Sequence, residues 1–208
     1  MRPWYRFCRL LCQLFFLLFF RGRVFHHERV PTQGGVLLVC NHQSFLDPVL
    51  ATQALPRECA YMARDTLFRN PHFRWLIESL NAFPVKRGSS DVGAIKETLR
   101  RLKDGQLITL FPEGTRTPDG RIHEMQPGAV LLARKAKVPI VPTLILGAFE
   151  CWPRHALLPR SRPIIVAHAA PIPPQMLQDL PDQAAIDFVR DRILELQRRY
   201  ERHPLLRG

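Results

Sequence analysis

The sequence predicts a single-domain α/β protein, a layered sandwich of a mostly parallel sheet with flanking helices, preceded by a membrane-associating N-terminal helix. Beyond Pro31, short apolar runs alternate with stretches of helical periodicity, as in chains whose parallel strands are joined by crossover helices. A length of 208 residues, 46% of them hydrophobic, suffices for one core but hardly for two. We therefore expect an N-terminal arm over residues 1–29 and one domain over residues 30–208.

The arm contains an apolar run, residues 10–20, between arginines at positions 2, 6 and 9 and at positions 21 and 23. A bilayer core requires roughly 20 apolar residues in a helix, so these 11 residues predict a helix that lies at the membrane surface with its arginines toward anionic head groups. A signal peptide, a tilted span and an ordinary buried helix are the alternatives. The residues after the run offer no small-residue cleavage site for a signal peptidase.

The apolar runs of the domain are its predicted strands. Residues 36–40 are apolar throughout, as expected of a strand that is buried on both faces. Further strands are predicted at residues 59–63, 82–85, 106–111, 138–145 and 162–167. Pro139 and Pro142 predict that the strand over 138–145 is an edge or irregular strand, because proline cannot donate to a ladder.

Helices are predicted between these strands and at the end of the chain. The pattern is clearest over residues 91–103, where Ile95, Leu99 and Leu102 recur at helical spacing. Ser90 is a predicted N-cap, and Gly105 is predicted to end this helix. Other helices are expected over residues 45–53, 127–135 and 182–202 and through residues 73–77, the last along the chain being amphipathic.

Charge and cysteine content restrict the partners. Thirty basic residues against 18 acidic ones give a net charge of +12, which favours phosphate groups, an anionic lipid surface or nucleic acid. Nucleic acid is not favoured, because no aromatic residues are interleaved with the basic ones as a stacking groove requires. The five cysteines are odd in number and scattered, which indicates reduced thiols in the cytoplasm.

Candidate chemistry begins at the end of the first buried strand of the domain, with His42 and Asp47. On a continuous helix, residues five apart point about 140° away from each other. If His42 instead lies in a turn and Asp47 in the first helical turn, the carboxylate can reach back to the imidazole. Such a carboxylate fixes the tautomer and leaves the other ring nitrogen free to remove a proton from an alcohol. A helix cap beside a loop histidine is the alternative.

Two clusters suited to phosphate follow later strands. Lys86, Arg87 and Gly88 follow the predicted strand over 82–85, and Glu113, Gly114, Thr115 and Arg116 follow the strand over 106–111. Basic side chains bind phosphate through charge-assisted hydrogen bonds, and glycine allows close backbone approach. Each cluster alone could be a solvated loop or a local ion pair. If the strands are parallel, both gather with His42 at one edge of the sheet.

Other chemistries lack their signatures. The remaining histidines show no metal-ligand spacing with cysteines or carboxylates, so no metal site is predicted. Ser44 lies near the candidate base, but no Gly-x-Ser-x-Gly segment makes it a nucleophile, and we interpret it as a helix cap.

Four segments in order resemble the four conserved blocks of the glycerolipid acyltransferases, in particular bacterial 1-acylglycerol-3-phosphate acyltransferases. The segments are residues 41–47, 83–88, 111–116 and 138–142, within a region of resemblance that runs from about Gly34 to Leu146. No block departs from the family pattern in its chemical residues. The specificity of the resemblance comes from four separate matches in the same order and spacing.

The resemblance implies an enzyme whose catalytic domain is residues 30–208. His42, oriented by Asp47, would deprotonate the free hydroxyl of 1-acylglycerol-3-phosphate, which attacks the thioester of acyl-CoA or acyl carrier protein and gives phosphatidic acid. The acceptor's phosphate would be bound by Arg87, with Lys86 nearby, and by Arg116. The acceptor would be held further by Glu113, Gly114 and neighbouring residues of the two clusters.

The resemblance implies no cofactor beyond the acyl donor. The reduced cysteines and the N-terminal arm predict a position at the cytoplasmic face of the cell membrane, peripheral or monotopic. Another lysolipid or glycerol 3-phosphate remains an alternative acceptor, because the blocks hold the reacting hydroxyl and the anionic group but not the whole head group. A non-catalytic membrane-binding or nucleic-acid-binding module is the alternative from another class, and it predicts no role for His42.

Overall fold

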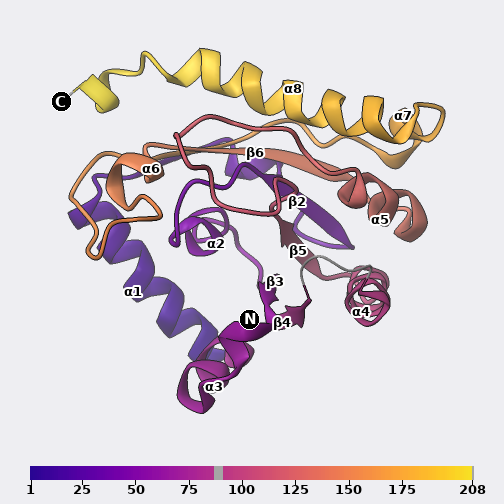
Figure 1. Cartoon of the computed structure of the whole chain (residues 1–208), viewed down its shortest axis with the longest axis horizontal. Helices are drawn as coiled ribbons and strands as arrows, with labels where there is room; N and C mark the ends of the chain where they lie inside the picture. The colour runs from indigo at the N-terminus through magenta and orange to yellow at the C-terminus, as the bar shows by residue number, and fades with distance from the viewer. Residues whose placement is uncertain (87–90, 208) are drawn as a thin grey trace.

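A computed structural model describes residues 1–86 and 91–207 as a seven-stranded sheet with helices on both faces (Figure 1). The strand order is β1-β7-β6-β2-β5-β3-β4. Five neighbouring strands from β6 to β4 are parallel, whereas β7 is antiparallel to β6 and carries β1 parallel to itself. The predicted α/β fold with a mostly parallel sheet is confirmed. The strands are β1 (Arg23–Phe25), β2 (Val36–Cys40), β3 (Cys59–Arg64), β4 (Ala82–Val85), β5 (Leu107–Leu110), β6 (Ile140–Leu146) and β7 (Ile165–His168).

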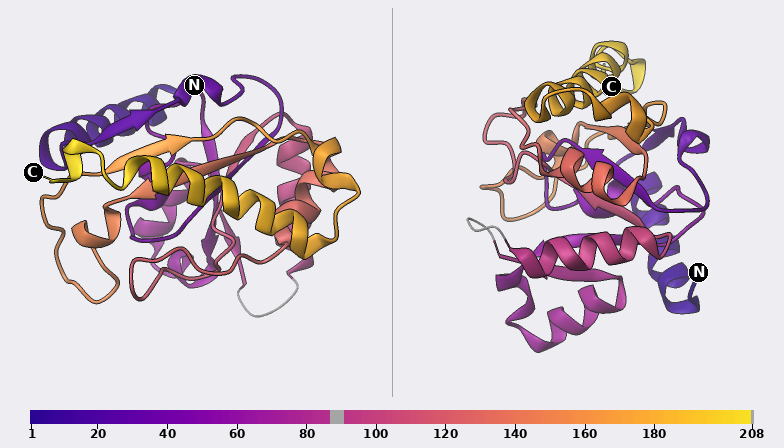
Figure 2. Two further views of the ribbon diagram at one scale, coloured as in Figure 1. Left: turned by 90° about the horizontal axis from the view of Figure 1, so that it is seen from above. Right: turned by 90° about the vertical axis from the view of Figure 1, so that its right-hand side faces the viewer.

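The helices form the two outer layers. On one face, α4, α5 and α8 pack against the sheet, and α1, α2 and α6 contribute to the core on the other (Figures 1 and 2). The helices are α1 (Pro3–Phe19), α2 (Asp47–Leu50), α3 (Pro71–Ser79), α4 (Val92–Lys103), α5 (Gly128–Ala136), α6 (Ala148–Cys151), α7 (Pro174–Gln178) and α8 (Asp182–Tyr200), with 3-10 turns η1 (His27–Arg29), η2 (Asp65–Phe68) and η3 (Pro204–Arg207).

Strand β2 is the centre of this arrangement. Its five residues are fully buried, and they alternate between the two cores, Leu37 and Val39 facing one and Val36, Leu38 and Cys40 the other. This explains why the strand is apolar at every position, since both of its faces are covered by helices. The residues that follow β2 therefore start from a rigid, fully packed strand.

Helix α1 packs by one side and exposes the other. Tyr5, Phe16 and Phe20 are buried, and the Tyr5 hydroxyl accepts a hydrogen bond of 3.1 Å from the backbone N–H of Cys59. Within residues 1–86 and 91–207, no helix is long and apolar enough to cross a membrane. Residues 23–25 of the predicted arm form β1, which pairs with β7 at one edge of the sheet. The division at residues 29 and 30 stays a prediction.

The prediction of an edge or irregular strand over residues 138–145 is wrong, because β6 runs as a regular strand over Ile140–Leu146 between β2 and β7. Pro139 precedes the strand. Pro142 accepts a hydrogen bond at its carbonyl from Ala169, one residue beyond the end of β7. The missing N–H of Pro142 therefore faces β7 at the point where the β6–β7 ladder ends. An interior strand tolerates a proline at such a position, because few ladder hydrogen bonds are lost there.

Helix ends show where local signals were right or wrong. The predicted stop at Gly105 is confirmed, because this residue has φ +76° and its N–H bonds to the Leu102 carbonyl. The N-cap of α4 is Asp91, whose carboxylate accepts from the N–H of Ala94, and the predicted cap Ser90 lies outside the described residues. Helix α2 covers only Asp47–Leu50, shorter than the predicted 45–53.

Candidate active site

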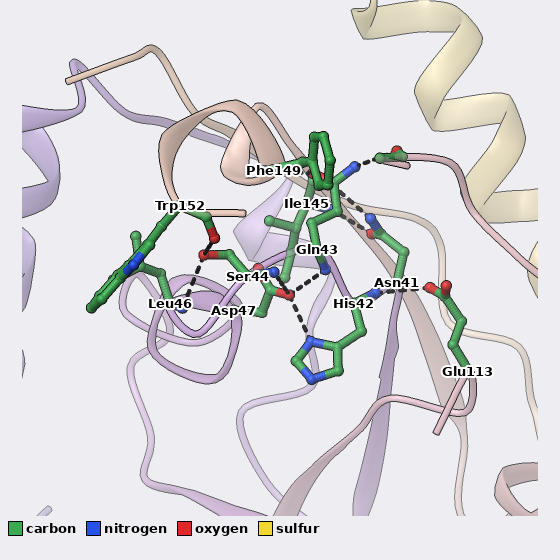
Figure 3. Close-up of polar contacts among 11 residues, drawn as sticks. Asn41, His42, Gln43, Ser44, Leu46, Asp47, Glu113, Ile145, Phe149 and Trp152 are labelled. Atoms are coloured by element: carbon green, nitrogen blue, oxygen red, sulfur yellow. Dashed lines mark hydrogen bonds and ion pairs between the residues drawn. The ribbon is translucent and has the colours of Figure 1, made fainter. Parts of the chain in front are cut away.

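The loop between β2 and α2 wraps around the Asp47 carboxylate. Asp47 is the first residue of α2, so its side chain points back along the chain toward the end of β2. Its Oδ2 accepts hydrogen bonds from His42 Nδ1 at 2.7 Å, from the Gln43 N–H at 2.5 Å and from the Ser44 N–H at 2.7 Å (Figure 3). The irregular backbone before α2 thus joins two side chains that a continuous helix would keep apart.

Asp47 is fully buried, and this has an electrostatic consequence. Burial raises the pKa of its carboxyl group, and the hydrogen bonds and charge of His42, with the N–H groups of Ser44 and Gln43, offset part of the increase. A buried carboxylate without such donors would be costly. The loop therefore supplies the groups that allow an anion to exist behind the imidazole.

The imidazole of His42 is held by its Nδ1 edge and by its face. Since an ionised Asp47 can only accept at Oδ2, Nδ1 carries the proton and Nε2 is the basic nitrogen. The ring stacks on Phe111, at the end of β5, with 4.3 Å between ring centres. Figure 3 shows Nε2 turned away from Asp47, and the side chain is 12% exposed. The arrangement suits a base that receives a proton from outside the loop.

The backbone of His42 is fixed on both sides by the segment after β5. Glu113 accepts at Oε1 from the His42 N–H at 2.8 Å, and the Thr117 N–H donates to the His42 carbonyl at 2.8 Å. The second Glu113 oxygen accepts from the His123 N–H at 3.3 Å. Burial raises the pKa of the Glu113 carboxyl, and these two N–H donors oppose that shift. In the structure the Glu113 carboxylate contacts the backbone N–H of His42. The predicted contact of Glu113 with the acceptor substrate stays a prediction.

Asn41 and Gln43 connect the same loop to β6 and to the segment after it. The Asn41 amide donates to the Ile145 carbonyl and accepts from the Ile145 N–H, both at 2.8 Å, as a neighbouring strand would. Gln43 donates to the Gly120 carbonyl at 3.0 Å and accepts from the Phe149 N–H at 3.4 Å. Both side chains are buried and were not predicted as site residues. The position of Asn41 directly after a fully apolar strand is the signal that could have found it.

Arg116 lies beside the loop of the candidate base. Its guanidinium carbon is 3.4 Å from the centre of the Phe45 ring, and Phe45 also contacts the Trp152 ring at 5.5 Å between centres. Phe45 is 53% exposed. The sequence did not predict this aromatic support, although Phe45 belongs to the same segment as His42 and Asp47.

The other predicted phosphate-binding and acceptor-binding residues are placed less closely. Lys86 is exposed after β4, three strands from β2, or about 14 Å at ordinary strand spacing. Arg87 and Gly88 lie outside the described residues. Gly114 has φ +72° in an exposed turn closed by its N–H to the Phe111 carbonyl, and Thr115 is exposed next to it. Of the predicted phosphate ligands that the structure describes, Lys86 and Arg116, only Arg116 lies against the His42 loop.

The interpretation of Ser44 as the cap of α2 is wrong. The N-cap position is Leu46, and the Ser44 hydroxyl donates to the Trp152 carbonyl at 3.0 Å. This hydrogen bond connects the loop that carries His42 to the segment after α6. No three histidine, cysteine or carboxylate side chains gather as a metal site in the part of the chain that the structure describes.

Comparison with known protein families identifies this arrangement. The family model described as "Acyltransferase" matches residues 22–146, more than half of the chain. This region contains the Asp47–His42 pair, Glu113 and Arg116. The chain belongs to the acyltransferase family.

Similar proteins have consistent names. The chain is 32% identical over 146 residues to a 1-acyl-sn-glycerol-3-phosphate acyltransferase of Bacillus subtilis. The match covers 69% of this chain and 71% of the relative. It is 34% identical over 152 residues to a protein of the same name from Streptococcus pneumoniae, covering 70% of this chain and 55% of the relative.

A solved structure extends the similarity to almost the whole fold. The crystal structure of a 1-acyl-sn-glycerophosphate acyltransferase from Thermotoga maritima matches with a TM-score of 0.82 and 24% identity. The match covers 96% of this acyltransferase and 81% of the other chain. The shared region therefore includes α1 and α8 as well as the central sheet.

Proposed function

We propose that this acyltransferase transfers an acyl chain from an acyl thioester to the free hydroxyl of 1-acylglycerol-3-phosphate, which gives phosphatidic acid for phospholipid biosynthesis. The observation that carries the proposal is the 2.7 Å contact between His42 Nδ1 and the buried Asp47 carboxylate, which leaves Nε2 as a base. The names of the similar proteins from Bacillus subtilis and Streptococcus pneumoniae support the choice of acceptor.

The chemistry follows from the tautomer of His42. Nε2 removes the proton from the acceptor hydroxyl as its oxygen attacks the thioester carbonyl. The tetrahedral intermediate then expels the thiolate, which takes the proton back from Nε2, so that the base is regenerated. Asp47 stabilises the imidazolium that exists between these two steps. The stacking of the ring on Phe111 limits its rotation while the proton is transferred.

The anionic end of the acceptor needs a cation close to the base. Arg116 meets this need, since its guanidinium lies over the ring of Phe45, three residues after His42. A planar guanidinium can bind two phosphate oxygens at once. Lys86 and Arg87 would complete the site, as the family resemblance implies. The acyl donor would be acyl-CoA or acyl carrier protein.

We also propose that α1 attaches the enzyme to an anionic membrane surface, at the cytoplasmic face of the cell membrane. Its exposed side carries large apolar residues, while Phe16 and Phe20 fix the opposite side in the core. Apolar burial combined with basic residues is the usual basis of interfacial attachment. The exposed residues are Trp4, Phe7, Leu10, Leu11, Leu14, Phe15, Leu17 and Leu18.

The first experiment is an acyl-transfer assay in mixed micelles with radiolabelled acyl-CoA and a panel of lysolipid acceptors and glycerol 3-phosphate. We expect activity on 1-acylglycerol-3-phosphate that falls by at least about a thousandfold in His42→Ala, because no other described group replaces the base. His72→Ala is the matched control, since His72 is exposed on α3. Activity on another acceptor only would overturn the named substrate, and full activity of His42→Ala would overturn the mechanism.

Membrane attachment by α1 requires point substitutions. Deleting the helix would expose the core contacts of Tyr5 and Phe16, so loss of binding would have two explanations. Leu14→Glu with Leu18→Glu changes only the exposed side. We expect this variant to leave the membrane fraction of lysed cells while keeping its activity in micelles. A variant that stays in the membrane fraction contradicts attachment through this side of α1.

A further inference from the structure

The loop between α6 and β7, residues 152–164, exposes two adjacent leucines. Leu157 is 93% exposed and Leu158 is 77% exposed, the two highest values among the large hydrophobic residues described. The loop is anchored at both ends, since the Arg160 N–H bonds to the Cys151 carbonyl at 2.7 Å and the indole of Trp152 bonds to the Ala156 carbonyl at 3.0 Å. The leucines therefore project into solvent from a constrained loop.

The charges around the leucines are of one sign. Arg154, Arg160 and Arg162 are exposed within the loop, and residues 152–164 contain no aspartate or glutamate. Apolar side chains at the centre of a basic loop fit a surface that is apolar inside and anionic outside. An anionic lipid bilayer has this chemistry.

The position of the loop supports the same partner. The Ser161 hydroxyl bonds to the carbonyl of Phe19, the last residue of α1, so the loop adjoins the C-terminal end of that helix (Figure 1). At its other end, Trp152 contacts Phe45 of the active-site loop. The loop therefore connects the proposed membrane helix with the site where a lysolipid would react.

We infer that residues 154–162 form a second membrane contact, in which Leu157 and Leu158 enter the acyl region of an anionic bilayer and the arginines bind lipid phosphates. With α1 alone, the enzyme could rotate about the helix axis on the surface. A second contact through the loop that adjoins Phe45 fixes the orientation of the enzyme on the membrane. The His42 loop then lies beside the bilayer from which the acceptor comes. The inference goes beyond the proposed function, because it concerns residues outside the site and a partner that is not consumed.

The test is vesicle binding by the full chain in the absence of acyl donor and acceptor. Flotation is measured with vesicles of phosphatidylcholine alone and with an equimolar mixture of phosphatidylcholine and phosphatidylglycerol. Leu157→Glu with Leu158→Glu is compared with Met176→Glu with Leu180→Glu, because the second pair is also exposed, at 57% and 37%, and carries the same change of charge. It lies in the α5, α7 and α8 layer, on the face of the sheet opposite α1.

We expect the loop variant to bind mixed vesicles at least about tenfold more weakly than the parent, because the full burial of one leucine side chain strengthens binding by about tenfold or more. The control pair should bind more tightly than the loop variant and close to the parent. Replacing the three arginines by glutamine should weaken binding to mixed vesicles by about fivefold for each arginine, with little effect on phosphatidylcholine vesicles. Unchanged binding of the loop variant, or equal losses in the loop and control variants, would overturn the inference.

Activity on a short-chain acceptor dissolved below its micelle concentration separates the loop from the chemistry. The loop variant should keep the parent's rate there and lose rate only on acceptor presented in anionic vesicles. An equal loss on the dissolved acceptor would mean that the loop acts through the active site, which contradicts the inference. Because vesicle binding needs no substrate, an error in the proposed acceptor would leave the binding result interpretable.

Discussion

At the scale of single residues, Asp47 shows how the fold accommodates a charge that it buries. The carboxylate has no exposure to solvent, and its Oδ2 atom alone receives three hydrogen bonds. Its Oδ1 atom has no hydrogen-bond partner within the described residues. Burial raises the pKa of the Asp47 carboxyl by more than these donors lower it.

The raised pKa of Asp47 predicts a pH dependence of stability. The folded state binds a proton more tightly than the unfolded chain, so the contribution of Asp47 is fully present below the ordinary pKa of 3.8 and is lost as pH rises through the folded pKa. Relative to Asp47→Asn, the parent should therefore gain unfolding free energy as pH falls through that window. Urea denaturation of both proteins at a series of pH values measures this. Parallel pH profiles would contradict the shift.

Phe45 supports the guanidinium of Arg116. We expect its contribution to acceptor binding to be separable from proton transfer. The contact of the guanidinium with the ring restricts an otherwise flexible cation, so less freedom is lost when phosphate binds. Phe45 has no group that can donate or accept a proton, and the imidazole is held by Asp47 and Phe111.

Phe45→Leu should raise KM for the acceptor by about twofold to thirtyfold with kcat nearly unchanged, which corresponds to the usual range of a cation–π contact. Phe45→Tyr keeps the aromatic face and should retain the parent's KM. Kinetics on a dissolved short-chain acceptor measure both values, with KM for the acyl donor as the internal reference. A loss of kcat in Phe45→Leu would indicate that the ring positions the base instead.

At the scale of elements, the active site depends on how β2 ends. The strand pairs with β5 on one side and β6 on the other, and Asn41 continues the contact with β6 through its side chain after the backbone pairing stops. Glu113 and Thr117, from the segment after β5, fix the next residue. His42 is therefore positioned from both neighbouring strands, and the loop needs no regular structure of its own.

Asn41→Ala should lower the free energy of unfolding by about 2 to 4 kcal/mol, because it removes two buried hydrogen bonds and leaves the N–H and carbonyl of Ile145 unpaired. Asn70→Ala is the control, since the Asn70 side chain also makes two hydrogen bonds to the backbone, accepting from two N–H groups, but is exposed at the start of α3, where a cap contributes about 1 kcal/mol. Urea denaturation measures both. Equal losses would show that Asn41 acts as an ordinary cap.

At the scale of the whole molecule, a buried histidine between β6 and β7 makes the sheet sensitive to acid. His168, at the end of β7, is buried and contacts the Thr143 hydroxyl of β6 through Nδ1 at 2.9 Å. Burial lowers the pKa of His168 to about 3. The antiparallel pair β6 and β7 can therefore hold only the neutral ring at ordinary pH.

Acidification should destabilise the protein through His168. The unfolded chain binds a proton near the ordinary pKa of 6.5, whereas the folded state does not until about 3, so stability is lost as pH falls between these values. His168→Asn keeps a polar atom near Thr143 without a titrating ring, and its stability should depend less on pH in this window. Thermal unfolding of both proteins from neutral to acidic pH checks the difference. The same slope in both would contradict it.

Elements whose signals are local could be predicted from the sequence. A fully apolar run gave β2, helical spacing with a glycine stop gave α4, and the placement of parallel strand ends indicated where His42, Asp47 and Arg116 would meet. Local chemistry suffices here because burial on both faces, helix periodicity and strand ends each leave a readable pattern in neighbouring residues.

The support that distant segments give to the site could not be predicted from the sequence. Glu113 on the His42 N–H, Asn41 on Ile145 and Phe111 beneath the imidazole each join residues from different strands. The interior position of β6 despite its prolines likewise depends on where β7 ends. Such contacts are fixed by strand order and register, and the spacing of residues along one chain does not encode which strands become neighbours.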